Sequence, residues 1–316
     1  RRVLFRSGFL GLINTINALD KQLYIGTKVG LYTLRFPSGK AAFQRVGDIK
    51  ATVWDLKKFT LSNGREILLG CTDEGIVEIH SNGFYQFIDK KVRNKNQPQN
   101  SKYRAYIIFR DPTRPNRVFL GLDNSITYLY HAKGSWYEEY SLEKLPDEIR
   151  SLGMDSEGNL WFGTKLKGIG FTDPNDTLFN ERLFDTLQGL PSNNDNYVTV
   201  LEEDVWVGTK EGLYRFDKNQ NRFSPDSVFN ASLPEGNNAL FRFHKDYEGD
   251  YWISFENSIH GWMIAVITKE REGYKANYRP FMFLPDFSVD AFFSKPGEGV
   301  WFSNSNELFH FNKDYP

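Results

Sequence analysis

The segment Leu160-Trp161-Phe162-Gly163-Thr164 decides the fold of this chain, because related segments recur along its whole length. Each copy is a short apolar run that ends near a Gly or Ser. The interval between copies ranges from 42 residues (Gly121 to Gly163) to 51 residues (Gly70 to Gly121). A period in the forties, built from strand-like apolar runs, is typical of the blades of a β-propeller. The six other copies lie at residues 23–27, 68–72, 118–122, 205–209, 251–254 and 300–303.

Each repeat divides into four short strands. In the best copy, residues 196–201, 205–208 and 213–216 form three predicted strands, and a fourth follows near residue 222. The second strand is apolar on both faces, which is expected for a strand packed between neighbouring blades. The turns between second and third strands carry glycine at a shared offset, which predicts a backbone with positive φ. These glycines are Gly30, Gly75, Gly168 and Gly212.

The two ends of the chain settle the number of blades. The seventh repeat has apolar runs at residues 287–293, 300–303 and 308–311 and then stops without a fourth strand, while residues 2–6 supply a spare one. We therefore predict an all-β, seven-bladed β-propeller that is a single domain over residues 1–316. Its ring is closed by the N-terminal strand, which completes the last blade and removes an exposed sheet edge. The alternative is that residues 1–7 are a frayed or foreign end. The predicted blade anchors are Gly26, Gly70, Gly121, Gly163, Gly208, Ser254 and Ser303.

The composition carries no strong global charge. The formal net charge is -1, so no overall field attracts nucleic acid or an anionic membrane. The single cysteine, Cys71, excludes an internal disulfide and leaves the compartment undecided. The sequence contains no apolar run of about 18 residues, the length that indicates a membrane-spanning helix. The chain begins without Met, so we expect it to be a piece of a longer protein from which a signal or anchor has been removed.

The sequence contains no motif for catalysis or metal binding. None of the five histidines pairs with another His, a Cys or a carboxylate at metal-ligand spacing. The run from Asp155 to Trp161 resembles the Asp-box of sialidase propellers, which is a turn element and not a catalytic one. We therefore expect no catalytic residue, no metal, no cofactor and no enzymatic activity.

What remains is a binding surface. In a propeller, the turns between second and third strands and the lead-ins to first strands lie on one face, around the mouth of the channel. Lys and Asn on that face suit a polar or anionic ligand such as an oligosaccharide, although any solvated loop is also polar. The predicted ligand-binding residues are Lys28, Lys165, Lys167, Lys210, Asn193, Asn194 and Asn237, within a wider set that includes Asp73 and Arg104.

Three segments resemble the two-component regulator propeller repeat. They are residues 155–164 (DSEGNLWFGT), residues 205–217 (VWVGTKEGLYRFD) and the lead-in at residues 189–194 (GLPSNN). The resemblance extends over essentially the whole chain and weakens in the third, sixth and seventh copies; Ser254 and Ser303 replace glycine in the last two. The family forms sensor regions of bacterial signalling proteins, especially hybrid two-component sensors of Bacteroidetes that respond to glycans.

The resemblance implies a non-enzymatic, periplasmic sensor module, the extracytoplasmic part of a membrane-anchored regulator. Such a module would bind a glycan or another small polar ligand, associate with a neighbouring sensor domain, and signal through a population shift. It would meet no nucleic acid in this segment and would reach the membrane only through flanking segments. Because the family has no fixed ligand motif, no binding residue carries over. The alternative is a protein-interaction scaffold without a small ligand, and a propeller hydrolase or lyase is less favoured.

Overall fold

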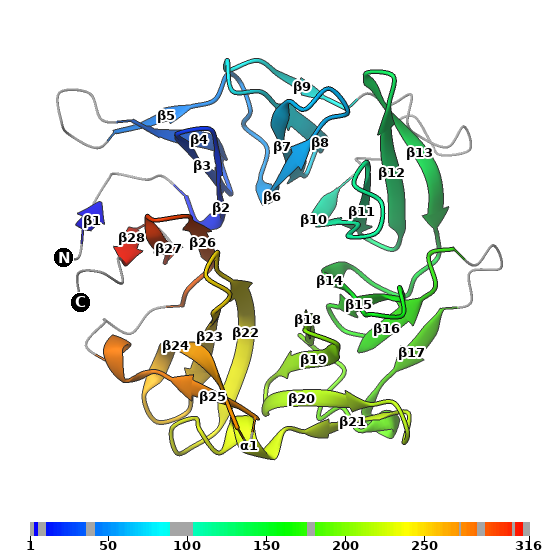
Figure 1. The fold of residues 1–316 in the computed structure, drawn as a ribbon, viewed down its shortest axis with the longest axis vertical. Coiled ribbons are helices and arrows are strands. Elements are labelled where there is room, and N and C mark those ends of the chain that lie inside the picture. Colours follow the sequence, from blue (N-terminus) through cyan, green and yellow to red (C-terminus); the bar gives the residue numbers. More distant parts are fainter. Residues whose placement is uncertain are drawn as a thin grey trace. The chain divides into compact units, whose positions relative to one another are not determined.

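Seven four-stranded sheets make up the fold, and each sheet is one blade of a β-propeller (Figure 1). The computed structural model describes residues 3–5, 11–35, 42–88, 104–175, 181–271, 273–282, 288–304 and 307–311. Contacts divide the chain into an N-terminal unit (Leu4–Ile149 with Ser305–Leu308) and a C-terminal unit (Arg1–Val3, Arg150–Asn304 and Phe309–Pro316). The predicted seven-bladed fold is confirmed, and the expectation of a single domain stays a prediction.

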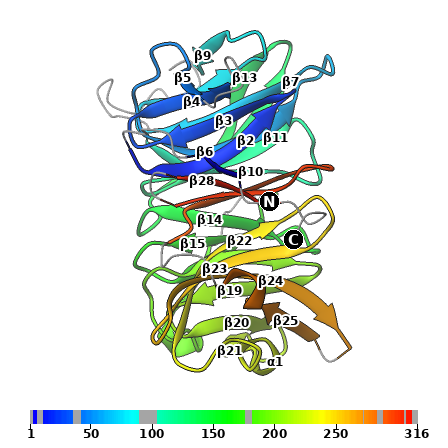
Figure 2. The same ribbon diagram turned by 90° about the vertical axis from the view of Figure 1, so that its left-hand side faces the viewer.

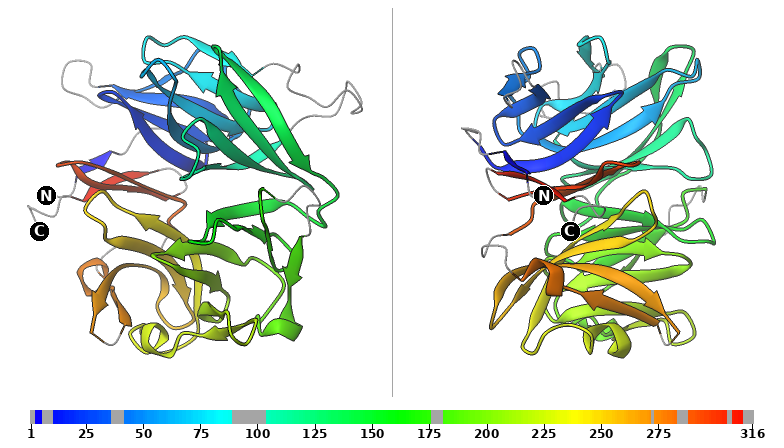
Figure 3. Two further views of the ribbon diagram at one scale, coloured as in Figure 1. Left: turned by 45° about the vertical axis from the view of Figure 1, so that its right-hand side comes forward. Right: turned by 60° about the vertical axis from the view of Figure 1, so that its left-hand side comes forward.

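The N-terminal unit contains three complete blades, drawn from blue to green in Figure 3. Their strands pair in sequence order, as the repeat predicts. Blade 1 consists of β2 (Ile13–Leu19), β3 (Gln22–Thr27), β4 (Gly30–Arg35) and β5 (Ala42–Arg45). Blade 2 consists of β6 (Val53–Thr60), β7 (Glu66–Thr72), β8 (Gly75–Ile79) and β9 (Tyr85–Phe87). Blade 3 consists of β10 (Ala105–Arg110), β11 (Arg117–Leu122), β12 (Ile126–Ala132) and β13 (Ser135–Leu142).

The C-terminal unit continues the same order with blades 4 to 6; blade 6 is yellow and orange in Figure 2. Blade 4 consists of β14 (Ile149–Met154), β15 (Leu160–Thr164), β16 (Ile169–Thr172) and β17 (Arg182–Phe184). Blade 5 consists of β18 (Tyr197–Leu201), β19 (Asp204–Thr209), β20 (Gly212–Asp217) and β21 (Arg222–Pro225). Blade 6 consists of β22 (Asn238–Lys245), β23 (Tyr251–Asn257), β24 (Gly261–Glu270) and β25 (Gly273–Asn277).

Three short helical turns complete the described chain: η3 (Thr186–Gln188), α1 (Ser227–Asn230) and η4 (Arg279–Phe281). None of the helices in the described ranges has the length and apolar character needed to cross a membrane.

The seventh blade is completed by the N-terminal strand. Its order is β1 (Val3–Phe5), β28 (Leu308–Phe311), β27 (Gly299–Ser303) and β26 (Ala291–Lys295). The strand expected at residues 2–6 is therefore the outer strand of the last sheet, which confirms the predicted closure. Pairing with β1 covers the edge that β28 would otherwise expose.

The apolar core lies between neighbouring blades, and the anchor glycine permits the close packing there. A Cβ atom on Gly163 would come within 3.0 Å of Ser151 Oγ and of the carbonyl oxygen of Asn196, just before β18 in the next blade. Trp161 packs into the same interface with Val198 and Phe223 of blade 5. The recurring glycine is therefore a packing requirement, because a larger residue would push the next blade away.

In two blades a residue other than glycine occupies the packing position. In blade 6, the Ser254 hydroxyl donates to the carbonyl oxygen of Val289, a residue that leads into blade 7 (3.2 Å). In blade 2 the strand register places Cys71, and not Gly70, opposite Asp55, as Gly26 lies opposite Thr15 in blade 1. The packing position of blade 2 is thus one residue later than the predicted anchor.

Four first strands contain a β-bulge near their start. The register shifts there place the extra residue at Asn14 in β2, Trp54 in β6, Tyr106 in β10 and Phe241 in β22. A bulge inserts one residue opposite the partner strand and re-aims its side chain. The starts of these strands therefore present side chains that a regular ladder would direct elsewhere.

Candidate functional site

A buried threonine closes the turn between the second and third strands in blades 1, 2, 4 and 5. In blade 4, Thr164 Oγ1 donates to the carbonyl oxygen of Gly168 (2.9 Å) and accepts from the backbone N–H of Lys167 (2.8 Å). The threonine in the recurring segment thus shapes the turn that displays the variable residues after it. The same donation joins Thr27 to Gly30, Thr72 to Gly75 and Thr209 to Gly212, at 2.9, 2.7 and 2.9 Å.

Successive loops of the C-terminal unit form a continuous polar chain, which we call the C-terminal turn face. The backbone N–H of Asp195 donates to the carbonyl oxygen of Lys165 (2.8 Å), and the Asp195 carboxylate pairs with Lys210 Nζ (3.2 Å). Asn237 Nδ2 donates to the carbonyl oxygen of Lys210 (2.9 Å), and the backbone N–H of Asn237 donates to Ser258 Oγ (2.9 Å). Loops from blades 4, 5 and 6 therefore meet at one edge of this unit.

The other predicted residues of this unit lie close to the same loops. Asn193 accepts from Gly168 N–H through its carbonyl oxygen (2.8 Å) and from Thr186 N–H through its side chain (3.1 Å). Asn194 and Lys167 have exposed side chains. The structure thus brings six of the seven predicted residues to one face, with Asn193 and Asn237 bound into the loops. Lys28 belongs to the N-terminal unit, where its carbonyl oxygen accepts from Thr52 Oγ1 (3.2 Å).

The ion pair between Lys210 and Asp195 changes the electrostatics expected for the C-terminal turn face. Both side chains are partly exposed, at 48% and 39%, so the pair is accessible and its charges largely cancel. An anionic ligand that binds Lys210 has to compete with Asp195. Lys210 is therefore already paired, and its role in binding a ligand stays a prediction, as do those of Lys165 and Lys167.

A second polar group joins blades 2 and 3 of the N-terminal unit, and we call it the N-terminal turn cluster. It consists of Trp54, Asp73, Arg104, Tyr106 and Asp123. Trp54 Nε1 donates to Asp73 Oδ1 (2.8 Å), and Arg104 Nε pairs with the same oxygen (3.2 Å). Arg104 Nη1 donates to the Tyr106 hydroxyl (3.5 Å), which in turn donates to Asp123 Oδ1 (2.6 Å). The rings of Trp54 and Tyr106 meet edge to face, with centroids 5.4 Å apart.

The Tyr106 hydroxyl stays protonated within this cluster. Burial, together with the hydrogen bond to Asp123, raises the pKa of the Tyr106 hydroxyl to about 12. A group with that pKa stays protonated near neutral pH, whereas a general acid or base works best with a pKa near the operating pH. Tyr106 therefore acts as a fixed hydrogen-bond donor.

Sequence reasoning found part of this cluster. Asp73 and Arg104 belong to the wider predicted set, while Trp54, Tyr106 and Asp123 were missed. The signal for Asp123 was available, because it follows Leu122 in the third copy as Asp73 follows Thr72 in the second. Trp54 and Tyr106 reach the cluster from bulged positions, and no residue pattern in the sequence marks a bulge.

The Asp-box-like run is a turn element, as predicted. Asp155 Oδ1 accepts from the backbone N–H groups of Glu157 and Asn159, and Asp155 Oδ2 accepts from Trp161 Nε1 (2.8 Å). Blade 6 repeats the arrangement, where Trp252 Nε1 donates to Asp246 Oδ2 (2.9 Å). The aspartate therefore ties the turn to the second strand of the same blade.

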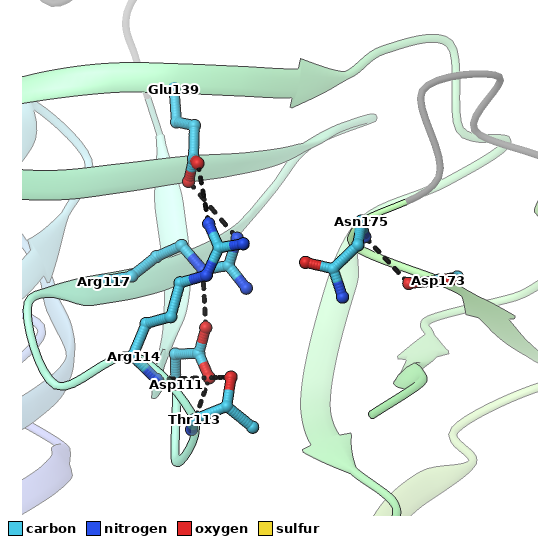
Figure 4. A network of polar contacts seen from close by, with 7 residues as sticks. All are labelled: Asp111, Thr113, Arg114, Arg117, Glu139, Asp173 and Asn175. Carbon is cyan, nitrogen blue, oxygen red and sulfur yellow. Dashed lines mark hydrogen bonds and ion pairs between the residues drawn. The ribbon is translucent and has the colours of Figure 1, made fainter. Parts of the chain in front are cut away.

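Blade 3 has the same turn with an arginine as donor (Figure 4). Asp111 Oδ1 accepts from the backbone N–H groups of Thr113 and Arg114, while Asp111 Oδ2 pairs with Arg117 Nε (2.5 Å). Both arginines also reach Glu139 on β13, at 3.0 Å from Arg114 and 3.3 Å from Arg117. Burial alone would raise the pKa of Asp111, but the hydrogen bonds from Thr113 and Arg117 outweigh it and lower that pKa.

Three carboxylates lie close together in the corresponding turn of blade 6. Asp246, Glu248 and Asp250 each have an oxygen within 4.8 Å of the others. Asp246 already accepts from the backbone N–H groups of Glu248 and Asp250 and from Trp252. These hydrogen bonds show that Asp246 stabilises the turn.

The blades and their turns define the class of protein as a β-propeller, and one of its repeats matches a known family model. Residues 144–165 match the family described as two component regulator propeller, which confirms the resemblance inferred from the sequence. The matched segment contains the Asp155 turn, the strand with Trp161, and Thr164, which begins the next turn. A comparison with curated protein sequences finds no match.

Solved structures with similar folds come from diverse proteins. Virginiamycin B lyase from Staphylococcus aureus is 14% identical, with a TM-score of 0.65 over 98% of this chain and 97% of that chain. The Pan2 WD40 domain from Neurospora crassa is 13% identical, with a TM-score of 0.62 over 98% and 92%. The extracellular domain of a putative hybrid two component system from B. thetaiotaomicron is 15% identical, with a TM-score of 0.50 over 95% of this chain and 46% of that chain. This chain thus spans less than half of that domain, and these identities establish likeness of fold alone.

Proposed function

We propose that this propeller is the non-enzymatic, ligand-sensing module of a bacterial two-component-type regulator and that it lies outside the cytoplasm. The single observation that carries the proposal is the two-component regulator propeller repeat at residues 144–165. The ligand is a glycan or another small polar molecule, bound by the C-terminal turn face or by the N-terminal turn cluster. Paired sensor domains respond through a population shift, in which the ligand favours one of two arrangements.

The side chains of the C-terminal turn face support a polar ligand. The C-terminal turn face offers the cations Lys165 and Lys167, the exposed amide of Asn194 and the accessible pair of Lys210 with Asp195. These groups donate and accept hydrogen bonds in the way that recognition of hydroxyl-rich ligands requires.

A thermal-shift screen of the 316-residue chain against neutral and acidic oligosaccharides tests the proposal. A ligand at 100 times its Kd should stabilise the native state by about 2.7 kcal/mol. If the C-terminal turn face binds the ligand, Lys165→Glu and Lys167→Glu should reduce the stabilisation. Lys218→Glu is the matched control, because Lys218 pairs with Glu157 on an exposed surface away from the turn face. Failure of every glycan to stabilise the protein would contradict the proposal.

A protein-interaction scaffold is the second candidate, and specific residues favour it. The side chains of Asn193 and Asn237 are already bound to backbone groups, of Thr186 and Lys210 respectively. Large apolar side chains are exposed in the neighbouring loops, with Leu187 at 85% and Ile259 at 63%. Exposed apolar residues rimmed by polar ones are typical of protein contacts. Under this alternative no glycan binds, and Leu187→Asp weakens self-association measured by sedimentation.

A further inference from the structure

Two kinds of backbone feature, β-bulges and turns, bring the side chains of the N-terminal turn cluster together. Bulges in β6 and β10 present Trp54 and Tyr106, while the turns after β7 and β11 present Asp73 and Asp123. Arg104 lies immediately before β10 and contacts members of both pairs. Bulges are enriched next to functional sites because they re-aim a side chain. Bulges at the same place in β2 and β22 show that the bulge itself belongs to the blade, so the distinctive feature of β6 and β10 is that their bulged aromatic residues contact polar side chains.

The cluster remains accessible to a ligand although its members bind one another. The side chain of Arg104 is 43% exposed and that of Asp73 is 27% exposed. Asp123 is exposed and Trp54 is half-buried. The buried Tyr106 hydroxyl holds Arg104 and Asp123 in place. The exposed groups are therefore preorganised, which lowers the entropy that a ligand must overcome on binding.

The charge balance of the cluster determines what it can bind. One guanidinium faces two carboxylates, since Arg104 pairs directly with Asp73 and reaches Asp123 through Tyr106. An added anion would meet a surplus of negative charge at short range. A neutral ligand with many hydroxyl groups avoids that cost, because carboxylates accept from hydroxyl groups and the guanidinium donates to them. Trp54 packs against the blade core, and the part of its half-buried indole that stays exposed can meet the C–H face of a sugar ring.

We propose that Trp54, Asp73, Arg104, Tyr106 and Asp123 form a subsite for a neutral sugar ring. This inference rests on the proposed sensing function and narrows its ligand from glycans in general to neutral ones. Trp54 provides the stacking surface, while Asp73, Arg104 and Asp123 bind hydroxyl groups. Tyr106 is a positioning residue that acts through Arg104 and Asp123.

Isothermal titration calorimetry on the 316-residue chain tests the subsite. The titrants are neutral gluco-, manno-, galacto-, xylo- and arabino-oligosaccharides, with oligogalacturonate and chondroitin sulfate oligosaccharides as acidic counterparts. The variants are Arg104→Gln, Asp123→Asn and Trp54→Leu. Arg114→Gln is the matched control, since it removes an equally exposed arginine of the same unit that pairs with Glu139. Circular dichroism melting of each variant checks folding separately.

The subsite predicts that at least one neutral oligosaccharide binds and that Arg104→Gln and Asp123→Asn each raise its Kd about tenfold or more, as expected when a charged hydrogen-bond partner is lost. Arg114→Gln should leave the Kd unchanged. Neutral binding that survives in folded Arg104→Gln, Asp123→Asn and Trp54→Leu overturns the subsite and leaves the sensing function intact. Binding of acidic glycans alone overturns the choice of ligand. No binding of any glycan contradicts both proposals.

Discussion

Arg117 Nε donates to Asp111 Oδ2 at 2.5 Å, in the position where Trp161 Nε1 donates to Asp155 Oδ2 at 2.8 Å in another blade. In both pairs the donor follows the aspartate by six residues, from the turn to the second strand. The aspartate therefore defines this turn, and either an indole or a guanidinium can complete it. In blade 3 the donor is the charged Arg117, which lies in the protein interior. The stability of the folded protein should therefore depend on its ion pair with Asp111.

Asp111→Ala should destabilise the protein by about 3–5 kcal/mol, because it leaves the Arg117 guanidinium buried without its closest anion. The side chains of Arg117 and Asp111 are 3% and 0% exposed, so water cannot replace the lost partner. Urea unfolding monitored by tryptophan fluorescence measures the change. Arg114→Ala is the control: it removes an exposed ion pair with Glu139 and should cost under about 1 kcal/mol. Equal losses of unfolding free energy in the two variants would show that the buried ion pair stabilises the protein no more than the exposed one.

The stabilising effect of Asp111 should disappear at acidic pH. The folded-state pKa of Asp111 lies below its usual 3.8, so its stabilisation is present above that value and is lost as the pH falls through the folded pKa. The difference in unfolding free energy between the unsubstituted protein and Asp111→Asn should therefore shrink as the pH falls below 3.8. Urea titrations across this pH range measure the difference, and a difference that stays constant down to about pH 2 is inconsistent with this assignment.

Thr164→Val should destabilise blade 4 by about 1–3 kcal/mol, because the backbone groups of Lys167 and Gly168 lose their buried hydrogen-bond partner. Thr164→Ser keeps the hydroxyl and should lose only about 1 kcal/mol for the missing methyl group. Midpoints of chemical unfolding compare the two variants. If serine is as damaging as valine, the hydroxyl is not what stabilises the turn.

Gly163→Ala should destabilise the protein by about 1–3 kcal/mol or more, since the new methyl group overlaps Ser151 and the Asn196 backbone. Gly158→Ala is the comparison: there the new atom meets open space, and only the positive φ of 88° is strained. That strain costs about 1–2 kcal/mol. Thermal unfolding distinguishes the two, and a smaller loss at Gly163 than at Gly158 argues against tight packing between blades.

The fold was largely predictable because its determinants are local and repeated. The apolar run around Trp161 marks the second strand, and the chain ends reveal the missing strand that β1 supplies. The one-residue shift of the blade 2 anchor from Gly70 to Cys71 was missed, although Cys71 precedes Thr72 as Gly26 precedes Thr27. The apolar run with its glycine was given more importance than the threonine that closes the turn, and the threonine marks the register that the pairing with β6 shows.

The candidate site was less predictable because it depends on contacts between blades. The sequence placed Lys210 in the turn after a second strand but could not show that Asp195, from the preceding lead-in, pairs with it. Trp54 and Tyr106 lie 52 residues apart in sequence, and their contact follows from neighbouring bulges. Composition and periodicity describe each blade separately, so they do not reveal such pairs.

The indole N–H resonance of Trp54 tests the central claim most directly. The chain has seven tryptophans, and Trp54→Phe assigns the Trp54 signal in a two-dimensional nitrogen–proton spectrum. During titration with the neutral oligosaccharide that stabilises the protein most, the Trp54 signal should shift in a saturable way. The signals of Trp161 and Trp252, held by Asp155 and Asp246, should stay in place. A saturable titration in which Trp54 does not move would contradict the assignment of the ligand to this cluster.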